Sequence, residues 1–361
     1  MRTPSGPPLP PRSAAAVRLA WNGERNLPPH AQLLIEVPSQ PKPLIARRLA
    51  LIEHVRGSLA RAGYFVSERC DIRPVSFDVV ARRDNDLLVL KVLTNIDALG
   101  ERVANEMKVL ARFLGGRAIV TGEKSGAGVL EQGVLYYRHG IPILHVESLI
   151  DCVLQDVPPF VYAAPGGYYC RLDAAALARA RHMRRVSLGE LAQVAGVSRR
   201  TISMYEDGMS ATLEAALRLE EFLGEALVRP LMDARGEAVP QEKRPDPAPE
   251  AAPADPSTPD DAVARPDWLE TTDGFEREVY TALHELGYEV VPTARSPFNA
   301  LSQERQTLIL TSVTREDGAT IRKARLVASL SAVTERPGVF FARRHAASHA
   351  SWAGKNWPAL K

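Results

Sequence analysis

The chain has 361 residues, of which 45% are apolar and 24% charged, and its formal net charge is +2. A chain of this length should fold as two or three domains, and its near-neutral charge excludes a uniformly basic nucleic-acid coat. Arg18 interrupts the apolar run near the start, and no uncharged apolar stretch has the length of a membrane span, so we predict neither a signal peptide nor a membrane contact. The three cysteines lack paired or metal-binding spacing, which favours a cytoplasmic location.

Three stretches have compositions that do not favour a packed core. Residues 1–43 contain ten prolines and little periodicity, which indicates a disordered or mis-called N-terminal extension. Residues 234–266 include eight prolines from Pro240 onward and mostly acidic charges, as expected of a flexible linker. Residues 344–361 form a tail whose histidines show no metal-ligand spacing.

The first folded region, residues 44–165, alternates helical and strand patterns. Apolar residues at helical spacing predict helices at about 45–62 and 101–114, which end at Gly63 and at Gly115-Gly116. Strands are predicted at 64–66, 76–82, 87–94, 118–121, 134–137 and 141–144. This order indicates a mixed α/β domain, and the proline and glycine residues of 155–169 indicate a linker of fixed shape after it.

Residues 171–228 carry the strongest local pattern. Ser187 and Glu190 have the spacing of a capping box, and Leu191, Val194 and Ala195 give the helix that follows a buried stripe. Gly196 stands where a turn needs a positive φ, and Val197 should fill the core beneath it. These features predict a helix-turn-helix, in which two helices are joined by a short turn.

The second helix of this motif should begin at Ser198, which can cap it. Ile202 and Tyr205 then point inward and leave Arg199, Arg200 and Ser203 outside. Six arginines from Arg179 to Arg200 face one acid, whereas five acids from Glu206 to Glu221 face one arginine. This polarity would turn the first half of the domain toward the phosphates of a polyanion.

The pattern resembles the Cro and phage-repressor class of DNA-binding domains. The order of the pieces is also similar to a family of archaeal helix-turn-helix transcriptional regulators, through Cys70–Pro74, Lys91–Asp97, Pro158–Gly167 and Arg199–Glu206. The resemblance implies sequence-specific binding of double-stranded DNA. The DNA contacts are expected from Arg184, Arg185, Ser187, Ser198, Arg199, Arg200, Thr201, Ser203 and Met204.

A second pattern lies in the first domain, where Asp78 on one strand and Lys91 on the next resemble the restriction-endonuclease-like fold of archaeal junction resolvases. That fold places a second carboxylate two residues before the lysine, where this chain has Val89. A valine cannot hold a divalent metal, although Glu53 or Glu106 could in principle supply a carboxylate. We therefore predict a degenerate nuclease fold without catalytic residues, metal ligands or a cofactor.

Residues 267–343 form a C-terminal α/β domain that looks like a possible repeat of the first. Its pattern of a helix, strands at about 308–313, a helix and a strand follows the same order, and Asn299 and Ser312 are thirteen positions apart, as are Asp78 and Lys91. The predicted architecture is thus a central helix-turn-helix bundle between two nuclease-like α/β domains.

The sequence as a whole predicts a transcriptional regulator that binds DNA as a homodimer, because one recognition helix reads only a half-site. Two other interpretations remain open. One is a metal-dependent nuclease or junction-resolving enzyme that uses the helix-turn-helix for targeting, and the other is an antitoxin-like interaction protein.

Overall fold

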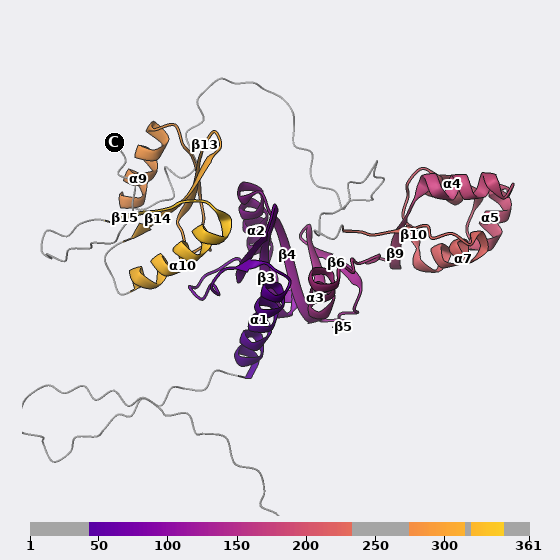
Figure 1. The fold of residues 1–361 in the computed structure, drawn as a ribbon, viewed down its shortest axis with the longest axis horizontal. Helices are drawn as coiled ribbons and strands as arrows, with labels where there is room; N and C mark the ends of the chain where they lie inside the picture. Colours follow the sequence, from indigo (N-terminus) through magenta and orange to yellow (C-terminus); the bar gives the residue numbers. More distant parts are fainter. Residues whose placement is uncertain (1–42, 233–273, 315–318, 343–361) are drawn as a thin grey trace, which may run out of the picture. The chain divides into compact units, whose positions relative to one another are not determined.

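The computed structural model describes residues 43–232, 274–314 and 319–342 (Figure 1). The predicted linker (234–266) and tail (344–361) lie outside the described residues, as does the predicted extension (1–43) except for its last residue. In the described part of the chain, no helix combines the length and apolar character that a membrane span needs.

The first α/β region is built on one large sheet. Its helices are α1 (Pro43–Arg61), α2 (Glu101–Leu114) and α3 (Val146–Gln155), with a 3₁₀ turn, η1, at Ile96–Ala98. Its strands are β1 (Phe65–Val66), β2 (Val79–Arg83), β3 (Asp86–Asn95), β4 (Arg117–Ser125), β5 (Gly128–Val129), β6 (Val134–Arg138), β7 (Ile141–His145), β8 (Val161–Ala164) and β9 (Gly167–Leu172). The strand order is β1-β2-β3-β4-β7-β6-β8-β9-β10, with β5 paired to β4 and β11 paired to β9.

Three features of this region differ from the sequence prediction. The second strand begins at Val79 rather than Ser76, because the residues before it form bends. Helix α3 was not predicted, although its buried Val146, Leu149, Ile150 and Val153 have helical spacing. The expected linker is instead the β8–β9 hairpin, in which Gly166-Gly167 supplies the turn with φ of 98° and 137°.

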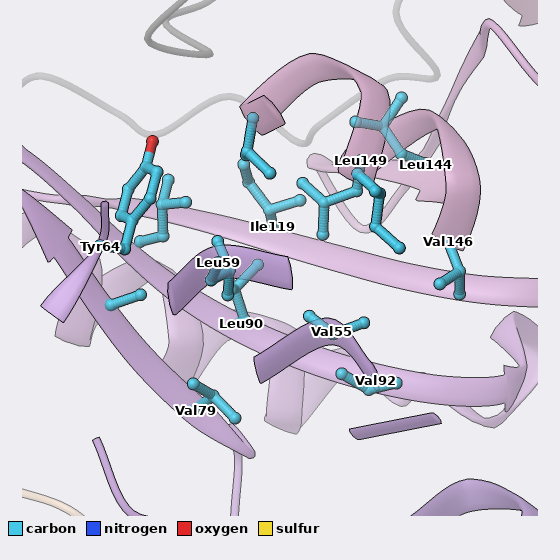
Figure 2. Packing of buried hydrophobic residues seen from close by; sticks show 14 of the residues in the cluster. Val55, Leu59, Tyr64, Val79, Leu90, Val92, Ile119, Leu144, Val146 and Leu149 are labelled. Atoms are coloured by element: carbon cyan, nitrogen blue, oxygen red, sulfur yellow. The ribbon is translucent and has the colours of Figure 1, made fainter. Parts of the chain in front are cut away.

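The main core lies between the sheet and the helices α1 and α3. Val55 and Leu59 of α1 contact the buried middle of β2 and β3, and Leu149 of α3 packs beside Ile119 of β4 (Figure 2). Leu90 in this layer has 0% of its surface exposed. The opposite face of the sheet is covered by α2, whose Met107 and Leu110 are also fully buried. The sheet is therefore covered on both faces, as its nearly continuous apolar strands require.

The helix-turn-helix region has its own core. It contains α4 (Ala174–Met183), α5 (Leu188–Ala195), α6 (Arg199–Glu206) and α7 (Leu213–Leu223), with the short strands β10 (Ala211–Thr212) and β11 (Val228–Arg229). Both short strands pair with β9, which joins this bundle to the sheet. The bundle buries Leu177, Leu191, Ile202, Leu219 and Leu223 completely.

The C-terminal region forms a second, four-stranded sheet. It contains α9 (Gly274–Glu285), β12 (Glu289–Pro292), β13 (Ala300–Glu304), β14 (Thr307–Thr314), α10 (Ala319–Thr334) and β15 (Gly338–Ala342) in the strand order β12-β13-β14-β15. The structure confirms the predicted order of helix, strands, helix and strand. Tyr280 and Leu283 of α9 pack on one face of this sheet.

Candidate nucleic-acid interface

Two serine side chains start the two helices of the motif. The Ser187 hydroxyl accepts a hydrogen bond from Glu190 N at 3.1 Å, which caps α5. The Ser198 hydroxyl accepts one from Thr201 N at 3.0 Å and lies 2.8 Å from the Thr201 hydroxyl. Each cap satisfies a backbone N–H that a helix start leaves without a partner, so both predicted helix starts are confirmed.

The turn between the helices is set by Gly196. Its φ is 71°, and its N–H bonds back to the carbonyls of Ala192 and Gln193 at the end of α5, as the predicted left-handed turn requires. The buried face of α5 is Leu191, Ala192 and Ala195, and the predicted Val194 is only half-buried. The buried stripe of α5 therefore includes Ala192 in place of Val194.

Helix α6 has one buried and one accessible side. Ile202 and Tyr205 are 0% and 2% exposed, while Arg199 and Arg200 are exposed and Thr201, Ser203 and Met204 are half-buried. The Arg199 guanidinium lies against α5, where a Cβ on Gly189 would stand 2.8 Å from its Nε. The missing side chain of Gly189 therefore leaves room for Arg199, a relation that the sequence analysis did not identify.

Not all the arginines counted toward the basic half are available to a ligand. Arg181 forms two hydrogen bonds to the Glu206 carboxylate, at 2.6 and 3.0 Å, and ties α4 to α6. Arg184 donates from Nη1 to the Phe222 carbonyl at 3.2 Å, near the end of α7. Arg185 is exposed and adopts a left-handed φ of 56°. The charge of this surface therefore comes from the exposed Arg179, Arg184, Arg185, Arg199 and Arg200.

In the nuclease-like pattern of the first region, Asp78 is paired with Arg48, a residue that the sequence analysis did not identify. Asp78 is fully buried, and Arg48 of α1 donates to both of its carboxylate oxygens at 2.6 and 2.7 Å. Val92 N donates to Oδ2 at 2.9 Å. The carboxylate thus has a cation and a backbone donor as partners within the protein.

The other residues of this pattern are also engaged. Lys91 donates to the Val75 carbonyl at 3.2 Å, and its burial lowers its pKa to about 8. Val89 is 0% exposed in the core. Glu53 pairs with Arg56 and Arg69, and Glu106 accepts hydrogen bonds from Arg295 N and the Ser296 hydroxyl. Among the described residues, no group of three His, Cys, Asp or Glu side chains could hold a metal ion.

The nuclease-like α/β sheet and the capped helix-turn-helix each match a known protein family. The chain matches the PD-(D/E)XK superfamily domain over residues 48–159 and the helix-turn-helix family over residues 177–228. The relatives include archaeal proteins that carry the provisional name of HTH-type transcriptional regulatory protein. One from Methanosarcina barkeri is 40% identical over 82% of this chain and 86% of its own length.

Other relatives have the same name and extent. One from Methanosarcina acetivorans is 42% identical over 80% of this chain and 85% of its own, and one from Halobacterium salinarum is 39% identical over 81% and 86%. No solved structure matches the chain. The chain belongs to this family of archaeal HTH-type transcriptional regulatory proteins, which confirms the family resemblance.

A PD-(D/E)XK domain implies a divalent metal, but the residues present do not fit one. A metal site in such a fold needs carboxylates that are open to the ion, whereas the Asp78 oxygens are held by Arg48 and Val92 N. The position of the second carboxylate is occupied by the buried Val89.

Proposed function

We propose that this protein regulates transcription by binding double-stranded DNA, with α6 lying in the major groove. The observation that carries the proposal is the pair of capped helices with a glycine turn, which leaves Arg199 and Arg200 exposed in the first turn of α6. In this class of motif the first turn of the second helix approaches the base edges. The names of the archaeal relatives support the same function.

The roles of the individual residues follow from their positions. Phosphates would be bound by Arg184, Arg185 and Arg200, and by the helix starts at Ser187 and Ser198, where backbone N–H groups favour anions. Bases would be read by Arg199, Arg200 and Ser203, with Thr201 and Met204 beside them on α6. Arg184 also donates from Nη1 to the Phe222 carbonyl.

Selection of binding sites from random duplex DNA tests this assignment. An arginine that bonds both acceptors of a guanine edge contributes about 1–3 kcal/mol of discrimination. Arg199→Ala or Arg200→Ala should therefore lose the preference for guanine at one position of each half-site. Arg184→Ala should weaken binding to all DNA sequences alike. It should also lower, by about one, the slope of the logarithm of the binding constant against the logarithm of the salt concentration. If Arg199→Ala, Arg200→Ala and Ser203→Ala all select the wild-type motif, α6 is not the reading helix.

The protein should have no nuclease activity, since Asp78 is paired with Arg48 and Val89 cannot bind a metal. The alternative of a metal-dependent or junction-resolving enzyme is favoured only by the superfamily match over residues 48–159. Supercoiled and branched DNA, incubated with the protein and Mg²⁺ or Mn²⁺, should remain uncut. Cleavage that disappears in Asp78→Ala or Lys91→Ala would establish the enzyme instead.

We further propose that the protein acts in the cytoplasm as a homodimer. A single recognition helix reads one half-site, so a two-fold operator needs two copies. All three cysteines are buried and none forms a disulfide, which agrees with a reducing compartment.

A further inference from the structure

The two central strands of the first sheet and of the C-terminal sheet pair in the same register. Val79 of β2 faces Leu90 of β3, and Ala300 of β13 faces Thr311 of β14, so both partners lie 221 positions further along the chain (300 less 79, and 311 less 90). The next strand, β4 or β15, is parallel in both sheets. The correspondence therefore extends over four strands in the same order.

The agreement continues in the hydrogen bonds of Asp78 and of Asn299, its equivalent in the C-terminal sheet. Asp78 N donates to the Leu90 carbonyl, and its carboxylate accepts from Val92 N. In the C-terminal sheet Asn299 N donates to the Thr311 carbonyl, and its side-chain oxygen accepts from Val313 N. Asp84 and Arg305, 221 positions apart, both have a left-handed φ, of 55° and 52°. Chance similarity of two α/β folds would not reproduce these details.

The two sheets also share one buried cluster, and their equivalent residues meet in it. Residues 221 positions apart that belong to this cluster are Phe77 and Phe298, Val80 and Leu301, Leu87 and Leu308, and Val89 and Leu310. Both helices that cover this face contribute to the same cluster, α2 with Leu110 and α10 with Leu330. The valine in place of the second nuclease carboxylate is thus part of this apolar contact.

Polar contacts surround the shared cluster. Glu106 of α2 accepts from Arg295 N at 2.8 Å and from the Ser296 hydroxyl at 3.1 Å. The Arg295 carbonyl accepts from Ser76 N at 2.7 Å. Arg82 of β2 donates to the carbonyl of Val333, near the end of α10, at 2.7 Å.

We propose that the C-terminal unit, residues 274–342, is a second copy of the β1–β4 part of the first α/β region. We also propose that the two copies pack against each other within one chain. The two copies pack through equivalent faces, as the subunits of a two-fold dimer do when one patch contacts the same patch of its partner. The face formed by β2, β3 and α2 is therefore covered within each chain. Contacts between two chains must use a different surface.

The packing of the C-terminal unit on the first region can be tested with a full-length chain that a protease cuts at one inserted site. A recognition site for a specific protease, flanked by glycine and serine spacers, is inserted between Pro240 and Pro266, and a denaturing gel confirms complete cleavage. The two pieces should still elute together from a sizing column at the mass of the uncut chain. Pieces that separate at micromolar concentration would overturn the proposal. This readout requires no DNA, so it is independent of the proposed function.

Two substitutions, one on each side of the contact, test its position. Glu106→Arg removes the acceptor of Arg295 N, and Ser296→Asp places a carboxylate against Glu106. Each should raise the dissociation constant of the cut pieces by about tenfold or more, because a partly buried charge or donor is left unpaired. Glu285→Arg, on the exposed end of α9, is the matched control.

Thermal unfolding of the uncut variants shows whether they are folded, and either folded variant suffices for the test. If the folded variants bind their other piece as tightly as the control does, the pieces are not joined at this face and the proposal is wrong.

Discussion

Gly189 determines where the Arg199 side chain can lie. A Cβ at this position would stand 2.8 Å from Nε and 3.0 Å from Nη2 of Arg199, which is closer than side chains pack. The guanidinium is the far end of a flexible side chain, so it would move and the helix would not. Gly189 can therefore orient Arg199, the side chain proposed to read bases.

We predict that Gly189→Ala alters DNA preference without lowering stability. Alanine is the better helix former by about 1 kcal/mol, so the melting temperature should be unchanged or higher. Binding-site selection should show weaker preference at the same half-site position that Arg199→Ala affects. Gly57→Ala, in the open middle of α1, is the matched control for the glycine change. A wild-type DNA motif for Gly189→Ala would show that the position of Arg199 is not constrained in this way.

Lys91 is a buried amine in the core of the first α/β region. Its pKa falls to about 8 because burial disfavours the ammonium, with Arg48 and Arg73 lowering it further and Asp78 opposing them. A lysine in the unfolded chain titrates near pH 10.4. Between about pH 8 and pH 10.4 the unfolded chain holds a proton that the folded chain has released, so this residue makes the protein more stable as the pH rises.

Lys91→Met should consequently raise the free energy of unfolding at pH 7, by about 1–3 kcal/mol. The gain should shrink between pH 8 and pH 10, where wild-type Lys91 is neutral when folded. Denaturant unfolding of both proteins across this pH range measures the difference in their free energies of unfolding. The other titrating groups are common to both proteins, so their contributions cancel in this difference. A variant that is less stable at pH 7, or whose difference from wild type does not change with pH, would contradict the assigned pKa.

At the scale of the element, Gly196 ends α5 with a φ of 71°. Any other L-residue adopts this left-handed backbone at a cost of roughly 1–2 kcal/mol, and a Cβ here would also stand 2.7 Å from Nη1 of Arg218. Gly196→Ala should lower the stability of the bundle by this amount, and Gly196→Val by more. Circular dichroism melting of the full chain measures the loss, and Gly57→Ala again controls for the removal of a glycine. An unchanged melting temperature would mean that the turn accommodates a side chain.

The helix-turn-helix could be predicted because its signals are local. Ser187, Gly196 and Ser198 each act on backbone groups within four residues, so a single sequence contains both partners. The β8–β9 hairpin was missed although its own pairing is local, with Ala164 opposite Gly167. Its place in the sheet depends on a distant partner, because β8 pairs with β6 across 27 positions, from Val134 to Val161. Prolines and glycines next to such a strand resemble a linker until the pairing partner is known.

The candidate metal site shows the same limit over a longer range. The absence of the second carboxylate is visible in the sequence as Val89, and the prediction of a degenerate site came from it. The pairing of Asp78 with Arg48 joins positions thirty residues apart on a strand and a helix. No spacing rule connects them, so only the fold identifies Arg48 as the residue that neutralises the carboxylate.

At the scale of the molecule, the described part of each chain contains one helix-turn-helix, with α6 as the proposed recognition helix, and the proposed internal packing covers the β2, β3 and α2 face. A homodimer on DNA must then be held together elsewhere, and it should impose its two-fold symmetry on the operator. Sites selected from random DNA should be inverted repeats whose half-sites are about 10–10.5 base pairs apart or a multiple of that. Sedimentation should find two chains on each selected duplex, and a duplex that keeps one half-site should bind far more weakly. A single asymmetric motif bound by one chain would contradict the homodimer, while leaving the reading role of α6 intact.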